Sequence, residues 1–434
     1  MTVASMQTLP PLASETLDIS FETDALTVLV RMFERHGDVF RVFSPALDRE
    51  IWVLSHPDHM RHVLVDNHGS FTKGIGIDRV AILLGNGLMT SEGAHWRKQR
   101  KRVQPAFHRN LIAAWMPHVK TANARLASRW SAAAHSGIPI NITQDMSEVT
   151  LDVVLKALFG NDLERLSENG DSPFTLLTDE TARNLAFAYK FRQLGKRIME
   201  EVERRRSDHV RSNDIVSMLI DARDRQTGEP MADRELLDEI LTLIVAGHET
   251  TASSLNWFWY LLTQSPHVVA RIHGEVDNAG GVEPEYDDLS AYPYTRRALD
   301  ETLRLYPPGW LLTRRSTAMT MLGDYELPAG THVLLSPYIV QRHPAYWDDP
   351  SRFEPDRFVA EVHARRNRFV YLPFGLGPRA CIGEHLALVE MHAHAITLTR
   401  RFEMSLAPGQ TIEMEPQVNL RTRRALQMNV RERT

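Results

Sequence analysis

"PFGLGPRACIG", residues 373 to 383, contains the single cysteine of a chain of 434 residues. Cys381 is surrounded by three glycines and follows Arg379 by two positions. The next segment, "GEHLALVEMHAHAITLTRRF", has apolar residues at helical spacing, so we expect Cys381 to lie at the N-terminus of a helix. Free N–H groups there stabilise an anion, and the thiolate is the form of cysteine that binds metal. A lone cysteine is more often a small buried apolar residue, but the glycines and the arginine favour a metal ligand.

The composition is typical of a globular protein, with 43% hydrophobic and 24% charged residues. A net charge of −5 gives no reason to expect a nucleic acid as partner. One cysteine excludes an internal disulfide and fits a reducing compartment. No Lys or Arg precedes Arg31, and Met1 to Ser20 contain no sustained apolar run, so a secretory signal is not expected. We therefore expect a cytoplasmic protein without a membrane anchor.

Apolar periodicity predicts a mainly α protein with small β-sheets towards its two ends, an α+β class. Residues 1–20 lack periodicity and are expected to form a loose tail, while 21–434 are expected to form a single catalytic domain. "ALTVLVRMFERHG" predicts a helix that ends at Gly37, and "DVFRVF" and "REIWVLSHP" predict short strands. Helical spacing dominates residues 92–262, and strands return in "MLGDYELPAGTHVLLS".

One segment, "DRELLDEILTLIVAGHETTASSLNWFWYLLTQSP", predicts a single long helix from Asp233 to about Gln264. Its middle is apolar on all sides, so it should be buried. Gly247 there costs about 1 kcal/mol relative to alanine, and the polar Glu249 and Thr250 follow it. The threonine hydroxyl could simply bond back to the preceding turn, and Glu249 could pair with an arginine. So many unfavourable residues in one buried helix nevertheless predict a functional site.

Two further pairs share a helix face. Glu301 and Arg304 are three apart in "RRALDETLRLYPP", a helix that the paired prolines should end. Trp96 and Arg100 are four apart in "GAHWRKQRKRV". Arg97, Lys98 and Lys101 of that helix are expected to form a solvated basic face.

These motifs together resemble the cytochrome P450 family. The cysteine stretch matches F-x-x-G-x-R-x-C-x-G, with five fixed positions in ten residues, and is similar to the family's haem-binding loop. "AGHETT", residues 246 to 251, resembles its oxygen-activation motif. E-x-x-R followed by "FEPDRF" resembles its Glu-Arg-Arg network, with Asp356 where Glu is commoner. The agreement covers roughly residues 35 to 425.

The resemblance implies the cytochrome P450 fold, with haem b between the long helix and the helix after the cysteine loop. Cys381 would be the axial iron ligand, and Glu249 and Thr250 would deliver protons for oxygen activation. The cofactor contacts it implies are Phe374, Gly377, Arg379, Gly383, Ala246, Gly247, Trp96, Arg100 and Arg315, the last with a one-residue ambiguity towards Arg314. Glu301, Arg304 and Arg357 would have a structural role.

The implied activity is that of a monooxygenase, which inserts one oxygen atom from O2 into a hydrophobic or amphiphilic substrate by hydroxylation or epoxidation. Candidate substrates are a fatty acid, a terpenoid or a natural-product intermediate. By position, the substrate pocket should use residues 74–87, 244–248, 309–313 and 417–420. The stretch between residues 163 and 200 looks shorter than the family's lid helices, which predicts an open entrance suited to a bulky or carrier-tethered substrate.

Electrons from NAD(P)H would arrive through a separate protein, since no flavin-reductase module is present. We expect an acidic ferredoxin or flavodoxin to dock on basic residues in 96–102 and 364–368 of a monomeric enzyme.

Two alternatives remain open. A haem-thiolate peroxygenase or isomerase would need no reductase, but also no proton-delivering Glu249 and Thr250. A non-enzymatic haem-based gas sensor would need an output module, and the sequence shows none beside the haem region.

Overall fold

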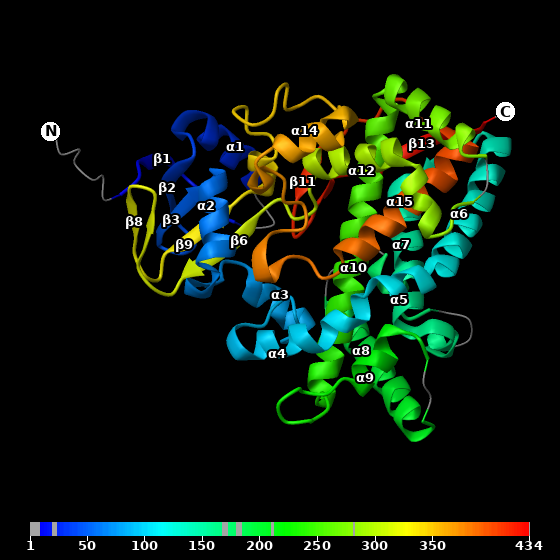
Figure 1. Cartoon of the computed structure of the whole chain (residues 1–434), viewed down its shortest axis with the longest axis horizontal. Coiled ribbons are helices and arrows are strands. Elements are labelled where there is room, and N and C mark those ends of the chain that lie inside the picture. The colour runs from blue at the N-terminus through cyan, green and yellow to red at the C-terminus, as the bar shows by residue number, and fades with distance from the viewer. Residues whose placement is uncertain are drawn as a thin grey trace. The chain divides into compact units, whose positions relative to one another are not determined.

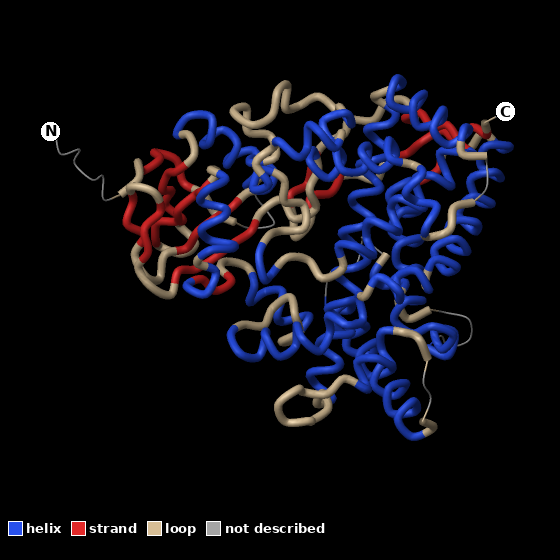
Figure 2. Tube along the Cα trace, in the orientation of Figure 1, coloured by secondary structure: helices blue, strands red, loops and turns tan. Residues whose placement is uncertain are grey.

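The computed structural model describes residues 9–19, 24–166, 172–178, 185–209, 212–280 and 283–433. The chain divides into two compact units, each built from segments distant in sequence (Figure 1). Unit 1 comprises Met1–Asp78, Arg297–Cys381 and Ile412–Arg424, and unit 2 comprises the remaining three segments. Helices form most of the traced chain, as predicted (Figure 2). The single catalytic domain over 21–434 stays a prediction.

Unit 1 is organised by a six-stranded mixed sheet of order β1-β2-β3-β9-β6-β4. Its strands are β1 (Leu12–Thr16), β2 (Val39–Ser44), β3 (Arg49–Leu54), β4 (Phe71–Lys73), β6 (Leu312–Ser316) and β9 (His332–Leu335). β2 and β3 form an antiparallel pair, whereas β3 and β9 are parallel. The predicted strands "DVFRVF" and "REIWVLSHP" are therefore confirmed and lie at the centre of this sheet.

The two faces of the sheet bury separate apolar clusters, because successive strand residues point to opposite sides. Trp52 and Val333 contribute to one cluster, which also contains Leu372, and Leu376 of the cysteine stretch packs against it. Val53 and the neighbouring alternate positions contribute to the other, which α1 (Ala25–His36) covers. The helix ends at Gly37, whose φ of +75° only glycine adopts readily.

The N-terminal tail is more ordered than the sequence predicted. Leu12–Thr16 form β1, which pairs in parallel with β2, and Arg41 donates a backbone N–H to the carbonyl of Pro11 at 2.8 Å. The prediction of a loose tail is wrong for these residues, because backbone pairing at a sheet edge does not require an alternating apolar pattern. The tail's first eight residues and residue 20 lie outside the described part of the chain.

The remaining elements of unit 1 are short. They are α2 (Pro57–Arg61), η1 (His62–Asp66), η2 (His68–Ser70), β7 (Thr320–Leu322), β8 (Tyr325–Leu327), α13 (Pro337–Val340), η7 (Pro355–Phe358), α14 (Ala360–Arg365), η8 (Arg368–Val370), η9 (Gly377–Arg379), β11 (Met414–Pro416) and β12 (Leu420–Thr422). Two helices, α3 (Ile77–Leu84) and α12 (Pro293–Leu305), contain residues of both units.

Unit 2 is helical apart from a three-stranded sheet of order β10-β13-β5. Its elements are α4 (Gly93–Val103), η3 (Gln104–Phe107), α5 (Arg109–Ala114), α6 (Met116–Ser136), β5 (Ile140–Asn141), α7 (Ile142–Phe159), η4 (Gly160–Leu166), η5 (Thr175–Leu177), α8 (Leu185–Ser207), α9 (Ile215–Asp221), α10 (Asp233–Thr263), α11 (Pro266–Asn278), η6 (Asp287–Ala291), α15 (Glu384–Arg401), β10 (Phe402–Leu406) and β13 (Gln427–Glu432). The long helix was predicted correctly as α10, which has 31 residues and packs along α7.

A buried polar link joins α10 and α15 in the core of unit 2. The indole N–H of Trp259 donates to Nε2 of His394 at 3.1 Å, and Nδ1 of His394 donates to Oδ1 of Asn123 on α6 at 2.9 Å. Burial lowers the pKa of His394 to about 3, so the imidazole is neutral and its tautomer is fixed by these two partners. The link therefore positions the helix that follows Cys381 without adding a charge to the core.

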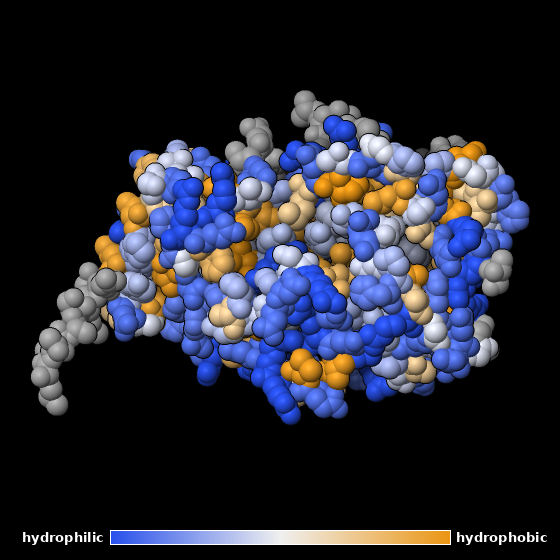
Figure 3. All heavy atoms as spheres, turned by 90° about the horizontal axis from the view of Figure 1, so that it is seen from above, coloured by the Kyte–Doolittle hydropathy of each residue, from blue (hydrophilic) through white to orange (hydrophobic). Residues whose placement is uncertain are grey.

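Hydrophilic residues cover much of the face drawn in Figure 3, with apolar residues gathered in smaller groups. Among the described residues, no helix is both long enough and apolar enough to cross a lipid bilayer.

Candidate active site

The cysteine loop belongs to unit 1 and is closed by its own backbone. The N–H of Cys381 donates to the carbonyl of Phe374 at 2.8 Å, and the N–H of Ala380 donates to Gly377 at 3.0 Å. The side chain of Cys381 is exposed at the end of this loop. Three residues later α15 begins, with Gly383 as its N-cap. The sequence prediction of a thiol just before a helix N-terminus is correct, and such a position favours the thiolate.

Gly377 has a packing role that the sequence did not reveal. Its φ is +70°, and a Cβ at this position would lie 2.0 Å from the carbonyl oxygen of Leu64. Any other residue would push the cysteine loop away from η1, because backbone atoms cannot give way. Gly377 therefore positions the loop against η1, and this is a sufficient reason for the glycine without any contact to a cofactor.

The middle of α10, in unit 2, is less buried than the segments on either side of it. Leu241–Ile244 and Thr251–Trp259 are buried, whereas Val245–Gly247, Glu249 and Thr250 are only half-buried. The hydroxyl of Thr250 donates to the carbonyl of Ala246 at 2.7 Å. One face of the helix over these two turns is therefore open to a ligand, and the apolar Ala246 and polar Thr250 share that face.

Gly247 and His248 lie next to the open face of α10 but point towards α7. A Cβ at Gly247 would approach Cγ2 of Val154 to 2.8 Å, so the glycine is explained by the close packing of α10 against α7. The predicted cofactor contact of Gly247 stays a prediction. His248 is buried and its Nε2 bonds the hydroxyl of Ser147 at 2.8 Å. His248 therefore has no part in the open face, although it lies within the predicted pocket segment 244–248.

Trp96 and Arg100 lie on one face of α4, in unit 2, and both are half-buried. Arg102, on another side of the same helix, is buried and pairs with Glu235 at 3.1 Å. Arg379 is half-buried in η9 of unit 1. These three predicted cofactor contacts thus retain polar atoms at accessible positions in their own units.

Arg315 does not match its prediction. It is exposed on β6, and its Nε approaches the carbonyl of Gly330 at 3.4 Å. Arg314 is half-buried and pairs in register with Val333, on the sheet face whose cluster contains Leu372. Neighbouring strand residues face opposite sides, so Arg314 and Arg315 lie on different faces of the sheet. Arg314 lies on the face that Leu376 of the cysteine loop packs against, which favours Arg314 over Arg315.

Glu301, Arg304 and Arg357 meet in unit 1. The guanidinium of Arg304 donates to both oxygens of Glu301, at 2.6 and 2.8 Å, and both side chains are fully buried. Arg357 approaches Glu301 at 3.3 Å. Arg304 also donates to the carbonyls of Gln341 and Pro350, each at 2.8 Å. The three residues therefore tie α12 to the segments that lead to the cysteine loop.

Comparison with known proteins agrees with this arrangement. The family model described as Cytochrome P450 matches residues 10–190 and 183–428. The chain belongs to the cytochrome P450 family. It is 35% identical to cyclooctatin synthase of Streptomyces melanosporofaciens over 89% of this chain and 87% of that one. It is 34% identical to cyclooctat-9-en-7-ol 5-monooxygenase of the same organism, over 87% and 84%. It is 29% identical to pentalenene oxygenase of Streptomyces avermitilis, over 87% and 86%.

The fold is also that of the family. The solved structure of the cytochrome P450DA heme domain superposes with a TM-score of 0.86 at 23% identity, covering 98% of this chain and 97% of that one. The protein is thus a P450 monooxygenase that uses haem b and O2, acts on a hydrophobic substrate and receives its electrons through a redox partner.

The residues present fit this cofactor in both units. Unit 1 offers an exposed thiol at the end of a rigid loop, and haem iron bound by a thiolate activates dioxygen. Unit 2 offers the half-exposed turns of α10, where a buried helix leaves one face uncovered. Phe374 and Arg379 in unit 1, and Trp96 and Arg100 in unit 2, are apolar, indole or cationic groups of the kind that bind a porphyrin and its propionates.

Sequence reasoning missed a clamp between α10 and the residues after α3. The backbone N–H of Asn86 donates to Asp238 at 2.7 Å, and that of Leu88 donates to Glu239 at 3.0 Å. A Cβ at Gly85 would collide with the Asp238 carboxylate. The sequence held two signs of this clamp: the turn "GNG", and two carboxylates in a helix that was predicted to be buried. The contacts show that α10 positions part of the predicted substrate segment 74–87.

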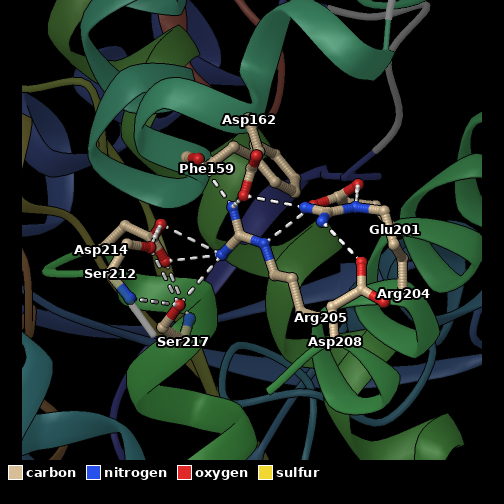
Figure 4. Close-up of polar contacts among 9 residues, drawn as sticks. All are labelled: Phe159, Asp162, Glu201, Arg204, Arg205, Asp208, Ser212, Asp214 and Ser217. Carbon is tan, nitrogen blue, oxygen red and sulfur yellow. Dashed lines mark hydrogen bonds and ion pairs between the residues drawn. The ribbon is translucent and has the colours of Figure 1, made fainter. Parts of the chain in front are cut away.

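A second missed feature is a buried ionic network around Arg205 (Figure 4). Its guanidinium contacts Glu201 at 2.9 Å, Asp214 at 2.8 Å and Asp162 at 3.0 Å, and donates to the carbonyl of Phe159 at 2.7 Å. Burial alone would raise the pKa of Glu201, but hydrogen bonds from Arg204 and Arg205 outweigh it and lower that pKa. The network joins α7, η4, α8 and the N-terminus of α9.

Proposed function

We propose that this cytochrome P450 hydroxylates or epoxidises a cyclic terpenoid. The observation that carries the proposal is the 34–35% identity, over nearly nine-tenths of the chain, to the two Streptomyces proteins named cyclooctatin synthase and cyclooctat-9-en-7-ol 5-monooxygenase. Pentalenene oxygenase is a third similar protein whose name specifies a terpene. A largely apolar polycyclic substrate suits a pocket with few polar groups.

Residues 74–78, the start of the first predicted substrate segment, adjoin the segments 309–313 and 417–420 in unit 1, which supports this choice. The hydroxyl of Thr313 donates to the carbonyl of Ile75 at 2.9 Å. The indole N–H of Trp310 donates to the carbonyl of Gln417 at 2.8 Å, and the N–H of Leu420 donates to Pro308 at 3.0 Å. These polar atoms satisfy one another, so the segments present mainly apolar side chains to a ligand.

Cys381 is proposed as the axial thiolate, with Glu249 and Thr250 as the proton-delivering pair. Thr250 Oγ1 already donates to Ala246, so its hydroxyl is oriented along the open face of α10 and can pass its proton to a ligand there by rotating about χ1. The half-buried Glu249 stands next to it and can exchange protons with solvent. We assign the propionate contacts to Trp96, Arg100, Arg379 and Arg314, replacing Arg315 for the reason given above.

The redox partner is proposed to be an acidic ferredoxin or flavodoxin that meets the cationic side of α4. Arg97 and Lys101 are exposed there, whereas Lys98 lies 3.9 Å from Glu235. In the second basic segment Arg366 stacks on Trp347, with its guanidinium carbon 4.1 Å from the ring centroid, and burial lowers its pKa. Arg366 is therefore structural, which reduces the predicted docking contribution of 364–368 to its exposed cations.

The predicted short lid falls partly on residues 167–171 and 179–184, outside the described residues. An open entrance for a bulky or carrier-tethered substrate stays a prediction, as do a cytoplasmic location and a monomeric state. The described pieces of this region are η4, η5 and the 23-residue α8.

The test begins with the visible spectrum of the reduced protein under carbon monoxide. Wild type should show the red-shifted band of thiolate-ligated haem, and Cys381→Ala should lose it while Arg192→Ala, an exposed change on α8, keeps it. The ferric protein is then titrated with cyclic diterpene alcohols and with fatty acids of equal carbon number. Displacement of iron-bound water by the terpenes alone supports the proposal. A response to fatty acids alone would overturn the substrate class, and an unchanged band in Cys381→Ala would overturn the ligand assignment.

A further inference from the structure

A hollow of about 850 Å³ lies wholly within unit 2 and belongs to neither the cysteine loop nor the open face of α10. Its walls are α4, the start of η3, α9 with the residues just before it, and the loop from Ala222 to Gln226 (Figure 1). This volume falls within the range of sites that hold a small organic molecule and exceeds what a single phosphate ion fills.

Cationic side chains dominate the lining. The lining includes Arg97, Lys98, Lys101, Arg102, Arg223 and Arg225, against only two carboxylates, Asp221 and Asp224. Such a concentration of positive charge is unusual in a chain whose net charge is −5. Arg97, Lys101 and Arg225 are exposed, and none of them forms an ion pair with a carboxylate among the described residues. Their charges are therefore available to a ligand.

The walls that carry these charges are fixed from behind. Arg102, with a side chain only 2% exposed, is held by Glu235 at 3.1 Å and by the carbonyl of Glu229 at 2.9 Å. Ser217, on the α9 wall, accepts from Arg205 at 3.1 Å and so connects the hollow to the buried network of Figure 4. The hollow is a built concavity rather than a gap between mobile side chains.

One of the two carboxylates is used by the loop itself. Asp224 accepts the N–H groups of Gln226 at 2.8 Å and Thr227 at 3.0 Å, and these backbone donors, followed by Lys98 and Arg102, lower its pKa. The loop is closed by a bridge between Arg223 and Pro230. Asp224 thus stabilises the turn that presents Arg225, and with six cations against two carboxylates the lining keeps an excess of positive charge.

Apolar residues complete the surface of the hollow. Ala94, Pro105, Ala106, Met218 and Ala222 lie among the cations. A ligand that matches both parts carries several negative charges and an apolar or aromatic body. Guanidinium groups bind phosphate oxygens in a bidentate manner, and ammonium groups add point charges, so phosphate is the anion that this mixture of Arg and Lys fits best.

We propose that this hollow binds an organic polyphosphate of the nucleotide class. The phosphates contact the cations of α4 and Arg225, and the organic part rests on the apolar residues of η3 and α9. Because α4 also presents Trp96 and Arg100 on a different face, occupancy of the hollow stiffens the helix that contributes the proposed propionate contacts. The inference goes beyond the proposed monooxygenase activity and does not depend on the identity of its substrate.

The test is isothermal titration calorimetry of the holoenzyme with magnesium-free ATP, AMP and inorganic tripolyphosphate at physiological ionic strength. ATP should bind more tightly than AMP, which has fewer charges, and more tightly than tripolyphosphate, which lacks the organic body. Arg225→Glu should weaken ATP binding about tenfold or more, because it reverses a charge beside a multivalent anion. Arg192→Glu, an equal charge change at an exposed position of α8 outside the hollow, should change it by less than about twofold.

Three outcomes would overturn the proposal. If Arg225→Glu and Arg192→Glu weakened ATP binding equally, or if affinity followed only the charge of the anion, the ligand would be an adventitious ion only. Absence of ATP binding to a holoenzyme with the normal carbon monoxide spectrum would exclude the site. Absence of ATP binding together with slower reduction of Arg225→Glu by an acidic ferredoxin would assign the hollow to the electron donor. None of these readouts requires turnover, so failure here is distinguishable from failure of the proposed substrate class.

Discussion

Two buried arginines, one in each unit, have different kinds of hydrogen-bond partners. Arg304 of α12 and Arg205 of α8 are both fully buried, and each binds a glutamate one helical turn earlier, at 2.6 and 2.9 Å. Beyond that glutamate, Arg304 donates to the main-chain carbonyls of Gln341, Pro350 and Arg352. Arg205 instead binds two further carboxylates, Asp214 and Asp162.

The difference shows that burial of an arginine can serve two purposes. Around Arg304 the partners are mostly neutral, so the guanidinium acts as a fixed donor that holds loop backbone in place. Around Arg205 the partners are mostly anionic, so the guanidinium neutralises charges that could not otherwise remain buried together. Loss of the first leaves unpaired carbonyls, and loss of the second leaves uncompensated negative charge. These two defects respond differently to pH, because carboxylates can be protonated and amide carbonyls cannot.

The largest effect is expected for Arg205→Ala. Removing the cation leaves Glu201 and Asp162 with Arg204, and Asp214 with hydrogen bonds from Ser212 and Ser217. It should lower the free energy of unfolding by about 5 kcal/mol at neutral pH. Arg205→Lys should recover part of this loss, because an ammonium group restores the charge but not the planar set of donors. Urea denaturation of the holoenzyme, followed by circular dichroism, gives the three values.

The pH dependence of that loss follows from the sign of the Glu201 shift. In wild type the pKa of Glu201 is lowered from its usual 4.5, so its contribution to stability is present above pH 4.5 and is lost as the pH falls through the lowered value. In Arg205→Ala the buried carboxylates take up protons more readily than in the unfolded chain. The deficit should therefore shrink as the pH falls below about 4.5. A deficit that stays constant with pH would mean that lost packing, not charge, is its cause.

A smaller and pH-independent effect is expected for Arg304→Ala. Glu301 keeps Arg357 at 3.3 Å and the N–H of Glu354 at 2.9 Å, so the carboxylate remains partly compensated. The unpaired carbonyls should cost about 3 kcal/mol of unfolding free energy, with little change between neutral and mildly acidic pH. The same denaturation series tests this, and a deficit that disappears at low pH would contradict the assignment of neutral partners.

The comparison also explains what the sequence could predict. Glu301 and Arg304 were found because their motif and its order along the chain are specific. Arg205 stands in "ERRRSD" between two other arginines, and its role depends on which of the three faces inward. Helical spacing gave the answer in principle, since Leu194, Ile198, Val202 and Arg205 form one buried stripe on α8. Helical periodicity predicts burial for apolar residues, so it did not predict that the charged Arg205 continues the buried stripe.

The active site shows the same limit at smaller scale. The cysteine loop and α10 were predicted correctly, because each is a contiguous segment whose residues act together. Arg314 and Arg315 could not be separated, because one residue of register decides the face of β6, and register depends on pairing with β9. Gly247 was noted for its cost in a helix and Gly377 for its place in the cysteine motif, but the neighbours that leave no room for a Cβ, Val154 and Leu64, are distant in sequence.

The smallest effect should come from an exposed pair on the same helix as Arg205. Lys196 and Glu200 have the same four-residue spacing as Glu201 and Arg205, but their nearest charged atoms are 3.6 Å apart and the side chains are 73% and 63% exposed. Water and salt screen such a pair, so Lys196→Ala should lower the unfolding free energy by about 0.3 kcal/mol, and less at high salt. Denaturation of Lys196→Ala beside Arg205→Ala compares the unfolding free energy of an exposed ion pair with that of a buried ionic network on the same helix. A loss comparable to that of Arg205→Ala would show that helix geometry, not burial, sets the strength of both pairs.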